Sequence, residues 1–457
     1  MLPAVDKKSG KPLTRQVYEF FQSAIIEGQL SKGDRLPSIR LLAKDLAVSN
    51  NTIISAYQQM VDEGYVENHL KKGFYVAALD PSIVPSVRPA SKKLKPADQP
   101  KIKFDLRHAN VDEANFPLKE WRKMQQLALN KFSYQYSDYF GEQSLKEQLC
   151  HYLYRSRGVV AEPKQVVIGA GVNTMMNILA LLFRDTRKRI VVEEPGYYEI
   201  RKVFAAADYK LIPTPVNSSG LRLDKLRSVK TDLVYITPSH QYPTGAIMPV
   251  SNRLNLLRWA HDTGTFIIED DYDSEFRHRG NPIPSLQGMD KGHRVIYVST
   301  FSKALTPALR MAYMVLPLEL TDKLNDVTIF SQTVPGFVQR ATALFMEHGY
   351  WDQHLRKMRK IYQQKYYASL AALEKVFGNS ISLTPSHAGL SILFHVENRL
   401  SDTMMIQKAL RQGILINSDR LSWTAPVARP GIFFGFGKLD TEKIEEAVAQ
   451  LKKSWLL

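Results

Sequence analysis

The chain has 457 residues, of which 44% are hydrophobic and 23% charged, a composition that excludes disordered, collagen-like and coiled-coil proteins. This length predicts two or three folding units that need no disulfide or structural metal. A single cysteine, Cys150, indicates a reducing compartment, and no Cys/His motif offers a metal site. Lys and Arg number 61 against 45 Asp and Glu; the net charge of +16 favours polyanionic partners but is spread along the chain. Without a signal peptide or a long apolar run, we expect a cytoplasmic protein with no membrane partner.

The first segment, residues 12–77, is predicted to form a compact helical unit that ends in a hairpin. Apolar residues at helical spacing indicate a helix over 13–27. Ser38 and Ser49 can each cap a further helix, the second of which runs over 50–63.

Two short alternating strands, 65–67 and 74–76, then flank a basic tip and complete the plan of a winged helix-turn-helix. The polar start of the last helix can read base edges in the major groove, while lysines of the wing contact phosphate. The alternative is a three-helix bundle with a solvated polar face. The predicted DNA-binding residues are Ser38, Asn50, Asn51, Thr52, Ser55, Lys71 and Lys72.

The stretch GDRLPSIRLLAKDLAVSNNTIISAYQQMVDEGYVENHLKKGFYV resembles the DNA-binding domain of the GntR family, which shares its LPS, VS-NT and EGY elements. The resemblance implies binding to double-stranded DNA. Ala47 stands where relatives usually have a turn glycine, and Asn50 where many have arginine. Operator preference therefore does not carry over from them.

Residues 78–104 hold five prolines and six basic residues without periodicity. We expect an extended linker there, between an N-terminal domain over 1–77 and a C-terminal domain over 105–457. It is either a plain tether or an additional set of contacts to DNA phosphate through Arg88, Lys92, Lys93 and Lys95.

From residue 105 onward, apolar runs of strand length alternate with helical segments: VVIGAG, RIVVEEPG, LVYITPSH, TFIIEDDYD, RVIYVSTFSK and YMVLP. Such runs predict an α/β fold with a largely parallel sheet buried on both faces, whose ligands bind at the strand ends. The stretch over about 350–457 predicts a smaller α+β subdomain.

Chemically active residues follow these strands in succession. A Gly-rich turn, Gly169–Gly171, leads into a helix start that can hold a phosphate. Later strand ends carry EPGYY, SHQYPTG, DDY and STFSK, with an arginine seven residues after the lysine.

This ordered set resembles the fold-type I pyridoxal-phosphate aminotransferases, and together with the winged helix it resembles the MocR subfamily of GntR regulators. The resemblance implies a bacterial transcription regulator, associated with the nucleoid when bound to DNA, whose aminotransferase-like domain binds pyridoxal 5′-phosphate. Lys303 would form the aldimine, Asp270 would pair with the pyridine nitrogen, and Tyr272 would bond the ring 3-oxygen. Tyr197 would stack on the ring. The further cofactor contacts implied are Val172, Asn173, Tyr242, Thr300, Ser302 and Arg310.

Tyr136 matches a tyrosine that reaches the phosphate of the opposite subunit, which implies a head-to-tail, domain-swapped homodimer that reads an operator of paired half-sites. Two points stay open at the cofactor site. Asp271 can replace Asp270 as the pyridine partner, and His240 and Gln241 either contact the cofactor or shape their loop.

One departure from the aminotransferases bears on function. Phe433 stands where those enzymes have an arginine that binds the substrate carboxylate. Bidentate recognition of a carboxylate is therefore missing, unless Arg429 or Arg201 supplies it. We therefore expect a regulator that senses pyridoxal phosphate or an amine-like or amino-acid-like effector, without physiological turnover. The alternatives are a catalytically active aminotransferase and a cofactor-free DNA-binding dimer.

Overall fold

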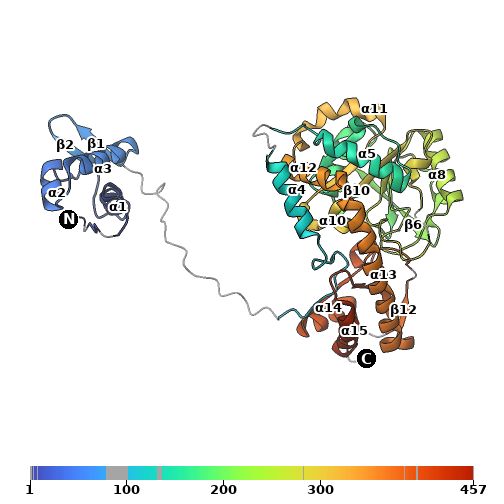
Figure 1. Cartoon of the computed structure of the whole chain (residues 1–457). Helices are drawn as coiled ribbons and strands as arrows, with labels where there is room; N and C mark the ends of the chain where they lie inside the picture. Colours follow the sequence, from blue (N-terminus) through green and yellow to red (C-terminus); the bar gives the residue numbers. More distant parts are fainter. Residues whose placement is uncertain are drawn as a thin grey trace. The chain divides into compact units, whose positions relative to one another are not determined.

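The computed structural model describes residues 3, 5–7, 9–78, 101–130, 136–280, 283–384, 386–397 and 400–455. The chain divides into two compact units, Met1–Ala97 and Asp98–Leu457 (Figure 1). Among the described residues, no helix combines the length and apolar character needed to cross a membrane, and no group of three His, Cys, Asp or Glu residues could hold a metal ion. Most of the predicted linker, with its four candidate phosphate contacts Arg88, Lys92, Lys93 and Lys95, lies outside these residues.

The first unit is a winged helix-turn-helix, as predicted. Its two strands pair antiparallel, from Val66 opposite Val76 to His69 opposite Gly73. Its elements are α1 (Leu13–Ile26), α2 (Ile39–Asp45), α3 (Asn50–Asp62), β1 (Val66–His69) and β2 (Gly73–Val76).

Helix α3 is anchored through Tyr57, which is fully buried. The Tyr57 hydroxyl donates to the Pro37 carbonyl at 3.0 Å, and its ring packs edge-on against Phe21 and Phe74. The turn before α3 places Ala47 at a φ of 51°, a left-handed conformation that favours glycine. Ala47 therefore adopts a conformation that a glycine would adopt with less strain.

The second unit is built around an eight-stranded mixed sheet in the order β4-β11-β10-β9-β8-β5-β6-β7. The five central strands β10, β9, β8, β5 and β6 are parallel, while β4, β11 and β7 pair antiparallel. The sequence predicted six of these strands and missed β6 and β7. The strands are β4 (Val166–Gly169), β5 (Arg189–Glu194), β6 (Lys210–Asn217), β7 (Gly220–Leu221), β8 (Leu233–Ile236), β9 (Phe266–Asp270), β10 (Val295–Thr300) and β11 (Ala312–Val315).

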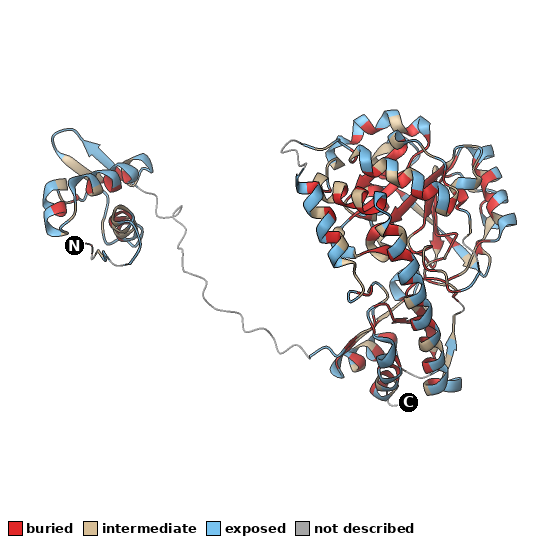
Figure 2. Ribbon diagram, viewed as in Figure 1, coloured by how far each residue is buried: buried red, intermediate tan, exposed pale blue. Residues whose placement is uncertain are grey.

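Helices cover this sheet, and Figure 2 shows the buried strands inside with one buried face on each surrounding helix. This is the layered arrangement of α/β proteins, in which ligands bind at the carboxyl ends of the strands. The helices of the unit are α4 (Leu118–Asn130), α5 (Gln143–Arg157), α6 (Val172–Leu182), α7 (Tyr198–Ala206), α8 (Val250–Thr263), α9 (Leu286–Met289), α10 (Phe301–Ala304), α11 (Leu318–Thr321), α12 (Gly336–Glu347), α13 (Tyr350–Phe377), α14 (Asp402–Arg411) and α15 (Ile444–Trp455).

A small subdomain forms an antiparallel sheet in the order β12-β13-β16-β15. Its strands are β12 (Ile381–Leu383), β13 (Ser391–Val396), β15 (Asn417–Ser418) and β16 (Ile432–Gly435).

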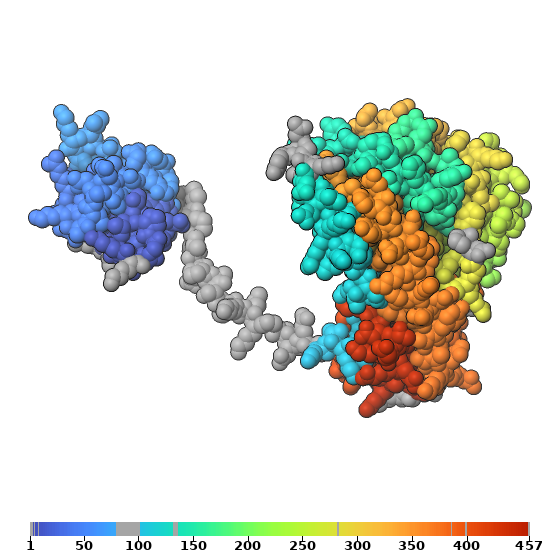
Figure 3. Space-filling view, in the orientation of Figure 1, coloured from blue at the N-terminus to red at the C-terminus, as the bar shows by residue number. Residues whose placement is uncertain are grey.

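The start of the second unit also belongs to this subdomain, because β3 (Phe104–Asp105) pairs in parallel with β14 (Ile414–Leu415). In Figure 3 this first segment of the unit lies against the red C-terminal residues. The domain boundary expected between residues 104 and 105 therefore falls inside a strand. A strand of two residues is too short to show periodicity in the sequence.

The segment after β3 is held to α13 by a buried ion pair. Lys365 Nζ lies 2.7 Å from Asp112 Oδ2, and both side chains are 5% exposed. We expect Lys365→Met to lower the free energy of unfolding by about 3–5 kcal/mol, because Asp112 would remain buried without its partner. Urea unfolding of the full chain measures this loss.

The neighbouring pair of Lys438 and Glu113 is the control, since its side chains are 44% and 70% exposed. Lys438→Met should cost less than about 1 kcal/mol. Equal losses in the two variants would contradict the role given to the buried pair.

Candidate functional site

A cavity of about 440 Å³ opens at the carboxyl ends of the central strands and is closed by residues of the small subdomain. Every residue predicted to hold a cofactor within one subunit lines it. They are Val172, Asn173, Tyr197, Tyr242, Asp270, Tyr272, Thr300, Ser302, Lys303 and Arg310. Tyr136, predicted to serve the opposite subunit, does not line this cavity and is 92% exposed. Its role stays a prediction.

Lys303 lies in the short helix α10, directly after β10. Its Nζ donates to the His108 carbonyl at 2.9 Å. Burial lowers the pKa of Lys303 to about 8, although the nearby carboxylate of Asp273 opposes this shift. A much larger fraction of this amine is therefore neutral at physiological pH than of an ordinary lysine, and only a neutral amine is a nucleophile.

Asp270, at the end of β9, presents a carboxylate to the cavity. Its Oδ2 accepts a hydrogen bond from the Tyr235 hydroxyl at 2.5 Å, while its Oδ1 is buried with no hydrogen-bond partner among the described residues. Burial raises the pKa of Asp270 to about 7. A protonated ring nitrogen would satisfy Oδ1 and favour the ionised carboxylate.

Asp271 faces away from the cavity and is fully engaged elsewhere. Its Oδ2 lies 2.7 Å from Arg157 Nε and accepts from the Tyr297 hydroxyl at 2.6 Å. Of the two aspartates that the sequence left open, Asp270 is the one that lines the cavity.

The opposite end of the cavity is suited to an anion. The first backbone N–H groups of α6, at Val172 and Asn173, begin the helix and have no partner within it. Gly171 precedes them at a φ of 91°, and a Cβ there would lie 2.7 Å from Arg310 Nη2. The Arg310 guanidinium is thus packed against the helix start, and the positive φ of Gly171 favours glycine there.

His240 lines the cavity through a hydrogen-bonded network. Its Nδ1 lies 2.8 Å from Asp273 Oδ2 and 3.0 Å from the Tyr272 hydroxyl, and its Nε2 lies 2.8 Å from Ser386 Oγ. Gln241 is 1% exposed, donates to the Pro195 carbonyl at 2.9 Å and does not line the cavity. Gln241 therefore shapes the loop, whereas His240 is placed to contact a ligand.

Phe433, on β16, forms an aromatic wall in the position expected for a carboxylate-binding arginine. Its ring stacks on Tyr242 with centroids 5.9 Å apart, and it packs at a tilt against His108 with centroids 4.7 Å apart. Burial and the charge of Lys303 lower the pKa of His108 to about 4, so His108 is neutral and adds no cation.

The two arginines that the sequence offered in place of the missing one are occupied. Arg429 pairs with Glu397 at 3.0 Å and is exposed, whereas Arg201 donates to the Ser422 carbonyl at 2.8 Å. Among the described residues that line the cavity, Arg310 is the one arginine.

His108, Asp273 and Ser386 are among the polar residues of the cavity that sequence reasoning missed. Asp273 follows the DDY run and could have been found by extending it. His108 and Ser386 follow short strands that carry no recognisable motif, so no sequence signal marks them.

The predicted DNA-binding residues lie on the surface of the first unit. Asn50, Asn51 and Ser55 are exposed on α3, whereas Thr52 is half-buried. The Thr52 hydroxyl lies 2.9 Å from Ser49 Oγ. Ser38, Lys71 and Lys72 are also exposed, with Ser38 capping α2 through the Leu41 N–H at 3.3 Å.

Two family models match the chain over its two units. The model described as "Bacterial regulatory proteins, gntR family" matches residues 13–76, and the model described as "Aminotransferase class I and II" matches residues 100–450. The fold and the matches define a DNA-binding domain joined to an aminotransferase-like domain.

Relatives share this order of domains along their whole length. The HTH-type transcriptional regulator YdeL of Bacillus subtilis (strain 168) is 36% identical over 99% of both chains. The probable rhizopine catabolism regulatory protein MocR of Rhizobium meliloti is 31% identical over 99% of this chain and 95% of its own. The chain belongs to the MocR-like family of HTH-type transcriptional regulators, in which a GntR domain is fused to an aminotransferase class I/II domain.

A solved structure supports the fold of the second unit. The multiple substrate aminotransferase from Thermococcus profundus superposes with a TM-score of 0.70 at 24% identity, over 78% of this chain and 92% of that chain. At this identity the similarity establishes the fold alone.

The pKa of Lys303 gives a pH prediction for the protein without cofactor. The neutral amine reacts with small amine reagents such as fluorodinitrobenzene, so labelling of Lys303 should accelerate as the pH rises through about 8. An ordinary lysine accelerates near pH 10.4. Peptide mass analysis after short exposures at pH 6 to 11 follows the label, and a midpoint at the ordinary value would contradict desolvation of Lys303.

Proposed function

We propose that the second unit binds pyridoxal 5′-phosphate in the cavity around Lys303 and that this site senses an amine-like effector to control DNA binding by the first unit. One observation carries the proposal. A desolvated lysine, a buried carboxylate oxygen without a partner and an open helix start beside an arginine line one cavity. These three features match the aldehyde, the ring nitrogen and the phosphate of this cofactor.

Each residue would have a distinct task in holding the cofactor. Arg310 and the N–H groups at the start of α6 would bind the phosphate, and Asp270 would keep the ring nitrogen protonated. Tyr197 would pack on the ring, and Lys303 would hold the cofactor covalently. When bound, pyridoxal phosphate supplies an electrophilic carbon that reacts reversibly with amines.

The proposed effector class follows from the aromatic wall. A ligand carboxylate placed against Phe433 would lose its water without gaining the paired hydrogen bonds of an arginine, which is unfavourable. This favours an amine effector whose anionic group, where it has one, lies away from Phe433. The same feature argues against an efficient aminotransferase.

We also propose that the regulator acts as a head-to-tail dimer that reads paired half-sites on DNA. The exposed Tyr136 would reach the phosphate of the neighbouring subunit, so each cofactor site would need two chains. Dimerisation would place two winged helices on one operator.

Lys303→Ala tests the cofactor site. It should abolish the visible absorbance band of the bound cofactor and the trapping of cofactor on the protein by borohydride, because no other amine would lie at the reacting position. Lys202→Ala is the control, since this lysine on α7 is 66% exposed and pairs with Glu199 outside the proposed attachment point. Mass spectrometry of the reduced wild-type protein must find the cofactor on residue 303. Attachment to another lysine would refute the assignment.

Two substitutions separate base reading from phosphate contact in the first unit. Asn51→Ala should reduce the preference for operator over random DNA by about 1–3 kcal/mol, because its amide would contact a base edge. Lys71→Ala should weaken binding to all sequences and flatten the salt dependence, because a wing lysine would contact phosphate. Titrations at fixed salt compare the two.

The opposite result, in which Asn51→Ala leaves the preference unchanged and Lys71→Ala removes it, would show that α3 is not the recognition helix.

A further inference from the structure

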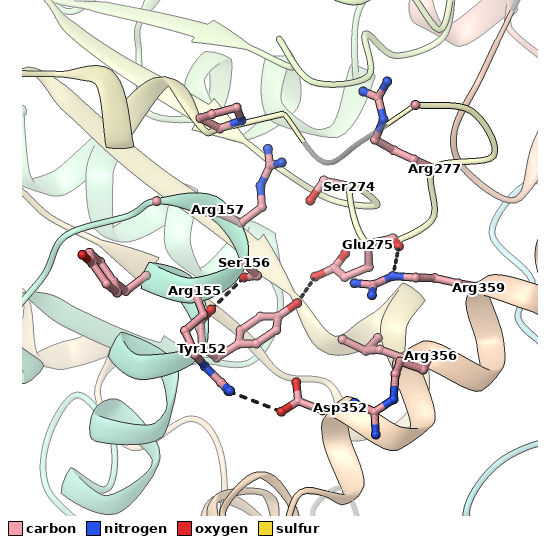
Figure 4. Close-up of a pocket in the computed structure, with 15 residues that line it drawn as sticks. Tyr152, Arg155, Ser156, Arg157, Ser274, Glu275, Arg277, Asp352, Arg356 and Arg359 are labelled. Carbon is pink, nitrogen blue, oxygen red and sulfur yellow. Dashed lines mark hydrogen bonds and ion pairs between the residues drawn. The ribbon is translucent and has the colours of Figure 1, made fainter.

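A second cavity lies in the same unit, between the end of α5, the loop after β9 and the first turns of α13. Its volume is about 720 Å³, and it shares no lining residue with the cavity around Lys303. Figure 4 shows its side chains. Five of them are arginines: Arg155, Arg157, Arg277, Arg356 and Arg359.

Two of these arginines are neutralised by acidic partners. Arg157 is buried against Asp271, and Arg155 lies 3.3 Å from Asp352, the contact drawn at the lower edge of Figure 4. These two pairs leave little charge for a ligand.

The other three arginines have no acidic partner among the described residues. Arg359 donates from Nε to the Glu275 carbonyl at 2.9 Å, and Arg277 donates to the Arg279 carbonyl at 3.2 Å. Arg356 is exposed and makes no side-chain hydrogen bond or ion pair within the described part of the chain. Their positive charge is therefore uncompensated.

The remaining carboxylate in the wall does not balance this charge. Burial raises the pKa of Glu275 to about 7, and even a fully ionised Glu275 would offset only one of the three positive charges. Glu275 Oε2 and Arg277 Nε are also buried without hydrogen-bond partners among the described residues. The wall thus has both positive charge and unused hydrogen-bonding capacity.

We propose that this arginine cavity, lined by Arg277, Arg356 and Arg359, is a second ligand site that binds a small molecule carrying a phosphate monoester. Such a group brings roughly −1.5 to −2 charges and three acceptor oxygens at pH 7, which suits three guanidinium groups. A lone carboxylate brings one charge and two oxygens. The volume lies in the range of sites for small organic ligands, about 300–1,000 Å³.

A small phosphate fits this site better than the backbone of DNA does. Each DNA phosphate carries one charge, and proteins follow a run of such charges with a continuous basic groove. Here two carboxylates, Glu275 and Asp352, interrupt the basic lining. The basic lining is therefore not a continuous groove.

Calorimetry on the full chain at pH 8 tests the proposal with phenyl phosphate, a dianion at this pH, and phenyl sulfate, a monoanion of the same shape. Phenyl phosphate should bind at least about tenfold more tightly. The variant Arg356→Gln/Arg359→Gln should lower that affinity at least about tenfold, because it removes two of the three free guanidinium groups. Both side chains are exposed, so folding is preserved.

Two control variants locate the binding. Lys357→Gln/Lys360→Gln removes the same charge from exposed residues of α13 that do not line the cavity, and it should change affinity less than about twofold. Arg310→Gln removes the proposed phosphate-binding arginine of the first cavity, so the part of the phenyl phosphate isotherm that Arg356→Gln/Arg359→Gln weakens should remain in this variant.

Three results would overturn the proposal. The lysine and arginine variants could lose affinity equally, Arg310→Gln alone could abolish binding, or the arginine variant could weaken only the binding of duplex DNA.

Discussion

The buried ion pair between Arg157 and Asp271 determines how the end of β9 faces the rest of the unit. Its two side chains are 6% and 1% exposed and 2.7 Å apart. Neighbouring residues along an extended chain point in opposite directions. With Asp271 held against α5, Asp270 turns to the cavity. The same guanidinium donates to Ser239 Oγ at 2.8 Å, and Ser239 directly precedes His240. Arg157 therefore holds both the loop after β8 and the residue after β9 in place.

The same burial that positions these groups also disfavours their charged forms. Burial raises the pKa of Asp270 to about 7 and lowers that of Lys303 to about 8. The buried ion pair of Lys365 and Asp112 in the same unit is arranged differently, since each of its two charges has a direct partner. Perturbed groups without partners gather where proteins do chemistry or bind ligands. The contrast with the Lys365 pair is consistent with the ligand site proposed around Lys303.

The sequence predicted most of the elements because their signals are local. Helices α1 and α3 follow from apolar periodicity, and the N-cap of α3 follows from Ser49, whose side chain accepts from the Thr52 N–H at 3.2 Å. Strand β6 was missed because its sequence, KLIPTPVN, contains two prolines and its burial varies along the strand.

The site was less predictable than the elements, because it depends on distant contacts. The choice between Asp270 and Asp271 rests on Arg157, which is more than a hundred residues earlier in the chain. His108 reaches the cavity through pairing of β3 with β14, a ladder of two residues on each side. Neither contact leaves a pattern in the local sequence.

Under the proposed function, Phe433 would change the ligand preference while the fold of an aminotransferase is kept. A guanidinium at that position would need a carboxylate to offset the cost of its desolvation. The phenyl ring needs none, because it is 3% exposed and packs between His108 and Tyr242. The cation that would select amino acids is thus replaced by a stable apolar wall, while Lys303, Asp270 and Arg310 still line the cavity. A cavity that keeps these three residues without a carboxylate-binding arginine would suit the proposed sensor, since a sensor must bind its ligand reversibly and need not release a product.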